Sequence, residues 1–461
     1  MQRFIGKYVD KIKKAAPRFE LGIKDLQSSA LPLGHAAAQN SKYLPNHPTS
    51  RKSISLLIIC NGHGEDLIAL EIIKRLILFE RIRKIEVLPL VGDGYIFDSI
   101  NSKVLVKIGN RINLPSGGFS NQSIKGLLKD LKAGLLVNLI RNWLLIRKKN
   151  KTNYKIIAIG DLLPLYFAWS SKCIFGFIGT PKSDYTWISG PGRAISDFYH
   201  RFKGSEWDPW EMYLMKSQKC KFVIVRDALT AKNLNFKNIN AQYFGNPMMD
   251  FIKENTFHPR NIESFQKLIM LIGSRIPEAL NNLDKFLSCL SSIEFPRKIL
   301  VLVPLSSNLD LIAIEDYFYK YNCLKEINEE YSLGEDSVWI KNNITFLIGK
   351  NTFNDWANLA QVGIANAGTA TEQISGLGVP SLSLPGKGPQ FTKSFAYRQQ
   401  RLLGGSVRVC SNQKILKKKL IDLLLDDELR KKQAFLGLER MGSKGSSEKI
   451  VEYIHLNFLS Q

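Results

Sequence analysis

A short segment after one apolar run carries residue types that suit nucleotide binding. The segment NAGTATEQ (366–373) contains Gly368, Thr369, Thr371 and Glu372, and it lies between two runs typical of buried strands. A glycine lets the backbone approach a ligand, and a helix that begins near Thr369 points N–H groups at a phosphate. Glu372 can accept hydrogen bonds from the two vicinal hydroxyls of a ribose. Alternatively, Thr369 and Glu372 form a capping box that needs no ligand.

Two further loops of this kind occur in the same part of the chain. Gly273, Ser274 and Arg275 end the run LIMLIGSR, where the arginine offers a forked pair of donors to a diphosphate. Lys387 lies between two glycines in LPGKGPQF, with the amide of Gln390 nearby. Any one of these loops is ordinary by itself. Three such loops with glycine, two of them with a cation, favour a nucleoside diphosphate as the ligand.

A different loop follows the first apolar run. It consists of Asn61, Gly62, His63, Gly64, Glu65 and Asp66. The spacing is not that of a dinucleotide-binding fingerprint, and two acids at a helix start would repel a phosphate. We therefore expect a neutral or hydroxyl-bearing acceptor, and His63, Glu65 or Asp66 could act as the general base that removes its proton. We assign this role to His63, with Asp66 or Asp161 as alternatives, and place Asn61, Gly62, Gly64 and Glu65 on the acceptor side. Alternatively, the acids complement the helix dipole and His63 is a turn residue.

Three more polar residues follow apolar runs in the N-terminal half. Asp161 ends KIIAIGD and is another candidate for the base, while Lys182 and Asp184 in GTPKSDY would lie on the acceptor side. No two aspartates have D-x-D spacing anywhere in the sequence. An enzyme that cleaves a nucleotide-sugar bond must then neutralise the departing diphosphate with arginine, lysine and helix amides. We therefore expect no metal site and no cofactor.

From residue 55 onward, short apolar runs alternate with helical patterns, which predicts parallel sheets covered on both faces. The predicted strands are 55–60, 84–90, 155–160, 174–179 and 221–225, followed by 268–273, 299–304, 344–349, 362–367, 381–385 and 406–410. The predicted divisions are a basic extension (1–52), an acceptor domain (53–250), a linker (251–266), a nucleotide-sugar domain (267–410) and C-terminal helices (411–461).

The charge of the chain limits its partners. In 461 residues, 64 lysines and arginines against 41 acids give a net charge of +23. Such a protein binds polyanions, whether nucleic acid, anionic lipid or phosphorylated small molecules. No nucleic-acid motif is present, so we do not expect nucleic acid. The six cysteines are scattered, which indicates buried thiols in a reducing cytosol.

One segment suggests a membrane surface. Residues 121–151 carry eight basic residues and one acid, with apolar residues at helical spacing. The residues expected to contact an anionic membrane are Leu135, Leu139, Trp143, Arg147 and Lys148. Alternatively, this helix packs on a sheet with a solvated basic face. No run is long and apolar enough to span a bilayer.

Taken together, the motifs resemble those of the lipid-A-disaccharide synthase-related proteins. The resemblance rests on NGHGED, LPSGGF (114–119), GD (160–161), GTPKSDY (179–185), FGNPMMD (244–250), GSR (273–275) and AGTATEQ with LPGKGPQFT, and it extends over about 53–409. These proteins are relatives of lipid-A-disaccharide synthase within the GT-B glycosyltransferases. The resemblance implies two Rossmann-like domains that face each other across a cleft, and a UDP-sugar donor in the second domain. It also implies inversion at the anomeric carbon, a peripheral location on the cytoplasmic face of a membrane, and a return of the C-terminal helices (411–461) to the first domain.

Carried onto this chain, the resemblance places Gly273, Ser274 and Arg275 at the diphosphate, Gly368, Thr369 and Thr371 at the phosphates, and Glu372 at the ribose. The synthase itself has a serine-, glycine- and acid-containing loop where this chain has NGHGED, so the acceptor stays open. The expected function is transfer of a sugar from a UDP-sugar to a lipid or amphiphilic acceptor. Alternatives are a UDP-sugar epimerase on the same scaffold and a non-catalytic binder of nucleotide sugars or nucleic acid. The oligomeric state is not predicted.

Overall fold

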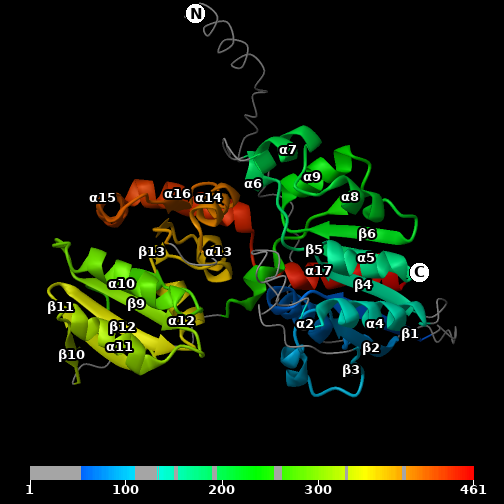
Figure 1. The fold of residues 1–461 in the computed structure, drawn as a ribbon, viewed down its shortest axis with the longest axis horizontal. Helices are drawn as coiled ribbons and strands as arrows, with labels where there is room; N and C mark the ends of the chain where they lie inside the picture. The colour runs from blue at the N-terminus through cyan, green and yellow to red at the C-terminus, as the bar shows by residue number, and fades with distance from the viewer. Residues whose placement is uncertain are drawn as a thin grey trace, which may run out of the picture. The chain divides into compact units, whose positions relative to one another are not determined.

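The computed structural model contains two α/β domains, each built on its own β-sheet (Figure 1). The described residues are 53–109, 132, 134–149, 154–188, 195–253, 262–327, 331–386 and 391–460. The predicted basic extension at 1–52 lies outside them. The two sheets confirm the predicted fold class of two domains with mainly parallel strands.

The first sheet has seven parallel strands in the order β3-β2-β1-β4-β5-β6-β7. They are β1 (Ile54–Cys60), β2 (Ile82–Pro89), β3 (Leu105–Lys107), β4 (Tyr154–Gly160), β5 (Ile174–Gly179), β6 (Cys220–Val225) and β7 (Ala241–Gln242). Successive side chains of a strand point to opposite faces, so Leu56 and Ile58 join one core while Leu57 and Ile59 join another. Both faces are buried, which explains the continuous apolar runs.

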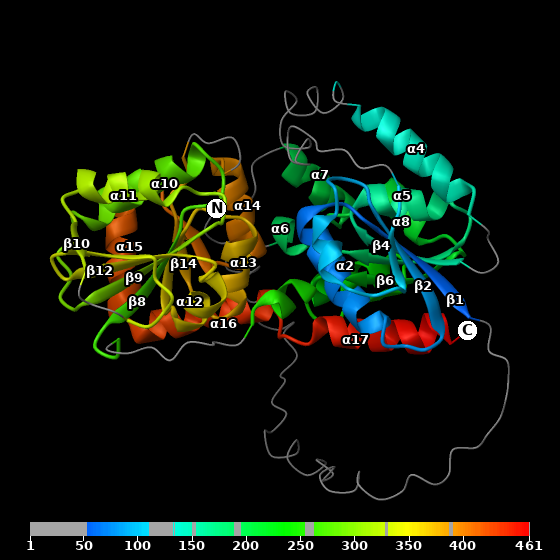
Figure 2. The ribbon, with the colours of Figure 1, turned by 90° about the horizontal axis from the view of Figure 1, so that it is seen from below.

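Helices cover both faces of this sheet. They are α2 (His63–Leu76), α4 (Leu135–Arg147), α5 (Leu162–Ser170), α6 (Tyr185–Ile188), α7 (Ile195–Lys203), α8 (Pro209–Met215), α9 (Ala228–Phe236) and the 3-10 turns η1 (Tyr95–Ser99) and η3 (Pro247–Phe251). One core is shared by α2 and the C-terminal helix α17 (Ser446–Ile454), and the other by α4, α5, α8 and α9. Figure 2 shows α4 and α17 on opposite sides of the first sheet.

The second sheet has eight strands in the order β10-β11-β12-β9-β8-β13-β14-β15. They are β8 (Gln266–Leu271), β9 (Ile299–Leu305), β10 (Leu324–Glu326), β11 (Ser337–Lys341), β12 (Ile344–Lys350), β13 (Val362–Ala365), β14 (Ser381–Ser383) and β15 (Val407–Val409). Six of them are parallel and correspond to the predicted runs. The other two, β10 and β11, add an antiparallel extension at one side of the sheet that the sequence reasoning did not predict.

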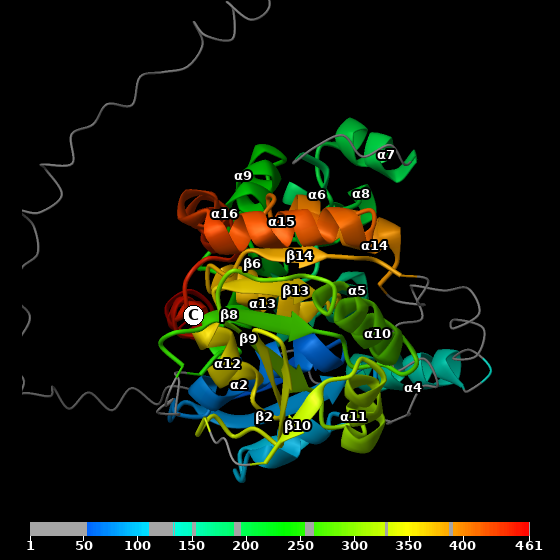
Figure 3. The ribbon, with the colours of Figure 1, turned by 90° about the vertical axis from the view of Figure 1, so that its left-hand side faces the viewer.

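Helices also cover both faces of the second sheet. They are α10 (Glu278–Leu290), α11 (Leu311–Lys320), α12 (Phe353–Leu359), α13 (Thr369–Gly376), α14 (Lys393–Leu402), α15 (Gln413–Leu425) and α16 (Asp427–Met441). The core on one face is built with α10, α11 and α15, and the core on the other with α12 and α13. Figure 3 shows α10 and α11 on one side of β8 and β9, with α12 on the other.

The chain returns to the first domain between α16 and α17. Helix α16 packs on α13, whereas α17 packs on α2 and ends in a π-helical turn (His455–Leu459). The carboxylate of Asp250 accepts hydrogen bonds from the backbone N–H groups of Gly445 and Ser447, both at 2.6 Å, and of Ser446 at 3.3 Å. A carboxylate at this position satisfies the first amides of α17 and favours its dipole. Asp250 therefore fixes where the returning helix begins.

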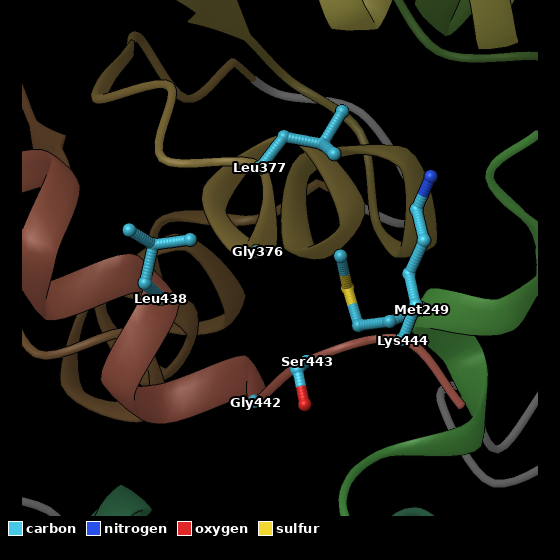
Figure 4. Close-up of a pocket in the computed structure, with 7 residues that line it drawn as sticks. All are labelled: Met249, Gly376, Leu377, Leu438, Gly442, Ser443 and Lys444. Carbon is cyan, nitrogen blue, oxygen red and sulfur yellow. The ribbon is translucent and has the colours of Figure 1, made fainter. Parts of the chain in front are cut away.

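A small cavity lies beside this crossover (Figure 4). Its volume is about 180 Å³, and its lining residues are Met249, Gly376, Leu377, Leu438, Gly442, Ser443 and Lys444. A Cβ atom at position 376 would lie 2.3 Å from the sulfur of Met249, so only glycine fits where η3 meets α13. The cavity adjoins the C-terminal end of α13. The predicted nucleotide residues occupy the opposite end of this helix.

Candidate functional site

The loops after β8 and β13 meet where these two neighbouring strands end, a side called here the carboxyl edge of the second sheet. The backbone N–H of Asn366 donates to the carbonyl of Leu271 at 2.9 Å. Gly273 has a φ of +90°, and a Cβ atom there would lie 3.2 Å from the Asn366 carbonyl oxygen. Glycine is therefore required for this close approach. The packing brings 273–275 and 368–372 to the same edge, as one shared ligand requires.

Asn366 ties three segments of this edge together. Its side-chain nitrogen donates to the Asn282 oxygen at 2.9 Å and to the Leu384 carbonyl at 2.7 Å. Its oxygen accepts from the Leu384 N–H at 3.0 Å and from the Ser383 hydroxyl at 3.2 Å. The side chain is buried and fully engaged, so it has a structural role. The sequence reasoning did not identify this residue, because its partners are far away in the chain.

The predicted capping box at the start of α13 does not form. Gly368 is the N-cap residue, and no side chain caps the helix. Thr369 is the first helical residue, so it lies one position too late to act as the cap. The Glu372 carboxylate is consequently available for a partner outside its own helix.

Thr371 is turned inward, which corrects the prediction that it contacts a phosphate. Its side chain is fully buried, and its hydroxyl donates to the Ala367 carbonyl at 2.7 Å. The Gln399 amide of α14 donates to the Ala367 and Gly368 carbonyls, both at 3.1 Å. Thr371 and Gln399 thus fix the backbone of residues 367 and 368 at the start of α13. The backbone N–H groups of the first turn remain the phosphate-binding element of the prediction.

Arg275 lies in the loop after β8. The Asn308 amide, from the loop after β9, donates to the Ser274 carbonyl at 2.8 Å and holds this loop in place. Burial lowers the pKa of the Arg275 guanidinium, and the nearby Glu278 carboxylate opposes this effect. An arginine this basic keeps its charge at neutral pH. Because β8 and β13 are adjacent strands, the Arg275 cation follows the strand next to the one that leads into α13.

Phe391, which follows the glycine-rich segment after β14, contacts helix α10. The Phe391 N–H donates to the Glu278 carboxylate at 2.7 Å, which anchors the end of this loop on α10. The predicted donor-binding residues Lys387 and Gln390 lie within 387–390, outside the described residues.

Glu372 forms an ion pair with an arginine of the first domain. The Nη2 atom of Arg226, which directly follows β6, lies 2.8 Å from the Oε2 atom of Glu372. The two side chains are 5% and 14% exposed. This pair joins the carboxyl edges of the two sheets. Sequence reasoning did not identify Arg226, although an arginine directly after a buried strand was a usable signal.

Polar residues converge where β1, β4 and β5 end. The Asn61 side chain donates to the Asp161 carboxylate at 2.9 Å, and the same carboxylate caps α5 by accepting from the Leu163 N–H at 3.1 Å. The Thr180 hydroxyl donates to the Glu65 carboxylate at 3.4 Å. The predicted residues Asn61, Glu65 and Asp161 are therefore brought together by three adjacent strands.

The start of α2 is closed by Asp66. Its carboxylate accepts from the Gly62 N–H at 3.0 Å and is almost fully buried. His63 is the first residue of α2 and Gly64 the second. The His63 side chain lies outside the described part of the structure. The contact with Gly62 gives Asp66 a structural role in the loop.

Burial changes the acidity of this cluster. It raises the pKa of the Glu65 carboxyl to about 7, with repulsion from Asp161 and Asp66 adding to the effect. It also raises the pKa of Asp66 to about 6 and that of Asp161 above its usual range. A carboxyl whose pKa is close to neutral can both accept and release a proton at working pH. The pKa of Glu65 lies closer to neutral than that of Asp66, which makes Glu65 a candidate for the general base.

Asp184 and Lys182 are engaged in structural contacts. Asp184 is fully buried and accepts from the Glu206 N–H at 2.6 Å and the Asn233 amide at 2.7 Å. This corrects the prediction that Asp184 lines the acceptor side. Lys182 forms an ion pair with the buried Glu211. The contacts of Asp184 and Lys182 fix neighbouring loops of the first domain. The contacts of Lys182 give no evidence that it binds a ligand directly.

Helix α4 turns the predicted membrane residues inward. Leu135 is buried, Leu139 and Trp143 pack against the core, and the Trp143 indole N–H donates to the Ser170 hydroxyl of α5 at 3.0 Å. Burial of Leu135 contradicts its predicted contact with a membrane, whereas Leu139 and Trp143 are partly buried and their contact with a membrane stays a prediction. Only the basic end, Arg147 and Lys148, is exposed as predicted.

The outer face of α4 is nevertheless apolar. Its exposed residues include Leu136, Val137, Ile140 and Leu144, each 47% to 57% exposed. The neighbouring helices α5 and α8 add exposed aromatic residues, namely Tyr166, Trp169, Trp210 and Tyr213. We call these eight residues the apolar face of the first domain. In the described part of the chain, no helix is both long enough and apolar enough to cross a bilayer.

Solved structures similar to this chain have the GT-B fold. The UDP-GlcNAc 2-epimerase from Neisseria meningitidis bound to UDP-GlcNAc is 14% identical, with a TM-score of 0.51 over 88% of this chain and 100% of that one. MnaA from S. aureus in complex with UDP is 13% identical, with a TM-score of 0.53 over 88% and 98%. The calicheamicin glycosyltransferase CalG4 is 11% identical, with a TM-score of 0.52 over 87% and 98%. No family model and no curated protein matches the sequence. At these identities the likeness establishes the fold.

The raised pKa of Glu65 predicts a pH-dependent effect on stability. Between its ordinary value of 4.5 and about 7, the folded state binds more protons at Glu65 than the unfolded state, so stability falls as pH rises through this window. Glu65→Gln should therefore stabilise the protein at pH 8 by on the order of 2 kcal/mol, and by much less near pH 5. Urea denaturation at the two pH values measures this difference.

A matched control lies on the same helix. Burial raises the pKa of Glu71, but contacts with Lys74 and Arg75 outweigh it and lower the pKa overall. Glu71 is then ionised at both pH values, so the effect of Glu71→Gln on stability should be the same at each. If the effect of Glu65→Gln on stability were also the same at pH 5 and pH 8, this would contradict the burial that raises the pKa of Glu65.

Proposed function

We propose that this protein is a GT-B glycosyltransferase that transfers a sugar from a UDP-sugar to a lipid or amphiphilic acceptor. The observation that carries the proposal is the position of Glu372 in the first turn of α13, beside the loop of Arg275 and linked to the first domain by Arg226. Membership of the lipid-A-disaccharide synthase-related proteins is part of the proposal, and it rests on the sequence motifs.

The second domain supplies complementary groups for a uridine diphosphate. The first-turn amides of α13 and the Arg275 guanidinium would bind the diphosphate, with Gly273 and Gly368 allowing close approach of the backbone. The Glu372 carboxylate would accept from the ribose hydroxyls. These groups come from adjacent strand ends held together by Asn366. Such prior positioning lets the site stabilise the charge that develops on the leaving group.

The first domain supplies the base. In the proposed step, the Glu65 carboxylate removes the proton of the acceptor hydroxyl as its oxygen forms a bond to the anomeric carbon. The bond between that carbon and the phosphate oxygen breaks, and UDP leaves with the electron pair, which inverts the configuration. Asp161 lies next to Glu65 and helps to keep its pKa near neutral. His63 remains the other candidate for the base, on the ground of its place in the sequence.

The acceptor is proposed to come from a membrane surface. The apolar face includes tryptophan and tyrosine, residues that favour the interface between lipid and water. Exposed Arg147 and Lys148 at the end of α4 would bind anionic headgroups. Helix α5 connects the two regions, because it begins at Asp161 in the polar cluster and carries Tyr166 and Trp169 of the apolar face. Peripheral attachment to the cytoplasmic side of a membrane follows as part of the proposal.

A UDP-sugar epimerase is the second candidate. The reported structures include a UDP-GlcNAc 2-epimerase with the same fold bound to UDP-GlcNAc. An epimerase converts its substrate without an acceptor, whereas a transferase releases UDP only when an acceptor takes the sugar. The two candidates therefore differ in their requirement for an acceptor.

Replacement of Glu65 should separate catalysis from donor binding. We expect Glu65→Gln to lower the transfer rate by about 100-fold or more, because a general base contributes about that much. UDP affinity should stay within about twofold, because the donor groups lie in the other domain. Transfer is measured with radiolabelled UDP-GlcNAc and a membrane lipid extract, and UDP affinity by calorimetry. Glu71→Gln, on the outer part of the same helix, is the control and should leave both quantities unchanged.

Three outcomes of this experiment would each contradict a different part of the proposal. Full transfer activity in Glu65→Gln would remove Glu65 from the base role and leave His63. Conversion of UDP-GlcNAc to its epimer without lipid would favour the second candidate. Absence of UDP binding by the unaltered protein would end the proposal for both candidates.

The apolar face predicts binding to anionic vesicles. Ile140→Asp should weaken binding to vesicles that contain phosphatidylglycerol by about tenfold, since it removes one buried aliphatic side chain from the interface and adds a charge. Leu78→Asp, an exposed leucine next to α2 on the other side of the sheet, is the matched control and should bind like the unaltered protein. Flotation through a sucrose gradient measures the bound fraction. Equal binding by both variants would place the membrane contact elsewhere.

A further inference from the structure

Arg226 is a buried cation that connects the first domain to the candidate donor site. It directly follows β6, is 5% exposed and contacts the Oε2 atom of Glu372 through Nη2 at 2.8 Å. The same Nη2 atom lies 3.7 Å from the sulfur of Met441, the last residue of α16. The guanidinium is therefore held between the start of α13 and the end of α16, both parts of the second domain.

The environment keeps Arg226 charged. Burial is the largest single effect and opposes the charge, but the attraction and hydrogen bond of Glu372, together with Asp227 and Tyr243, outweigh it and raise the pKa of the guanidinium above its usual value. A buried arginine without its partner would carry an uncompensated charge. Glu372 is therefore the partner that makes burial of Arg226 tolerable. In turn, Arg226 restricts the orientation of the Glu372 carboxylate.

The geometry leaves one carboxylate oxygen for a ligand. Arg226 contacts Oε2, and among the described residues Oε1 of Glu372 has no hydrogen-bond partner. The Glu372 side chain is 14% exposed, so this oxygen is partly accessible. A carboxylate with one oxygen held and the other accessible is suited to a hydroxyl donor.

We propose that Arg226 is a positioning residue for ribose recognition: from the first domain it holds Glu372 so that the free carboxylate oxygen meets the hydroxyls of the nucleotide ribose. This inference rests on the proposed UDP-sugar function and adds a determinant of its specificity. Selection of a ribonucleotide then depends on both domains, although the nucleotide itself is bound by the second.

Other contacts between the domains provide a comparison. Arg398 of α14 forms an ion pair with Glu206, and Arg401 donates to the Thr186 carbonyl of α6. Arg398 joins the domains through Glu206, whereas the ion-pair partner of Glu372 is Arg226. A variant of Arg398 therefore reports the effect of weaker domain contact alone. It serves as the matched control for Arg226.

The test compares UDP with 2′-deoxy-UDP by calorimetry. The unaltered protein should prefer UDP by about tenfold, since the deoxynucleotide leaves a charged acceptor without one hydrogen bond. Glu372→Gln and Arg226→Met should each bring the ratio of UDP affinity to 2′-deoxy-UDP affinity close to one, mainly by weakening the binding of UDP. Arg398→Met should retain it. Altered domain contact affects both nucleotides equally, so only loss of ribose recognition changes their ratio.

Three results would overturn the inference. A ribose preference that persists in Arg226→Met would show that Glu372 does not need Arg226. Tighter binding of UDP by that variant would make Arg226 a competitor of the ribose. Absence of UDP binding by the unaltered protein would overturn the proposed function as well as this inference. If UDP binds but Arg226→Met has the same ratio of UDP affinity to 2′-deoxy-UDP affinity as the unaltered protein, only this inference is overturned. If Arg226→Met does not fold, Arg226→Lys retains the charge without the forked geometry and is judged by the same ratio.

Discussion

A buried ion pair between Arg226 and Glu372 links the carboxyl edges of two separate sheets. Removing one partner of such a pair typically costs about 3–5 kcal/mol, because it leaves a charge without compensation. The pair therefore constrains both the contact between the domains and the orientation of the carboxylate. The pair contacts a loop on either side, namely the start of α13 in the candidate donor site of the second domain and the strand end before α9 in the first domain.

Much of the fold was predictable because buried parallel strands are continuous apolar runs. All six parallel strands of the second sheet and five strands of the first correspond to such runs. The strands that were missed are short or lie at the margins of a sheet, as β3, β7, β10 and β11 do. Edge strands bury fewer side chains, so their sequences carry a weaker apolar signal. The antiparallel pairing of β11 with β12 is a local hairpin, in which Lys341 pairs with Ile344 across the turn Asn342-Asn343, and the sequence reasoning did not recognise this turn.

The candidate site was predictable where it depends on strand ends and not where it depends on distant contacts. Glycine before a cation or an acid indicated the loops of Arg275 and Glu372, which the structure brings to one edge. Asn366 was missed because its partners are remote in sequence, and the position of Arg226 directly after a buried strand did not reveal its partner Glu372 in the other domain. For α4, periodicity identified two faces without showing which is buried. Two asparagines, Asn138 and Asn142, face inward and leave leucine and isoleucine outside, contrary to the usual amphipathic arrangement.

The most direct measurement of the central claim is a crystal structure of the protein with UDP. The account predicts that the ribose hydroxyls lie within hydrogen-bonding distance of the Glu372 carboxylate, with the diphosphate between Arg275 and the first amides of α13. A uridine bound elsewhere, or one whose ribose points away from Glu372, would contradict the account.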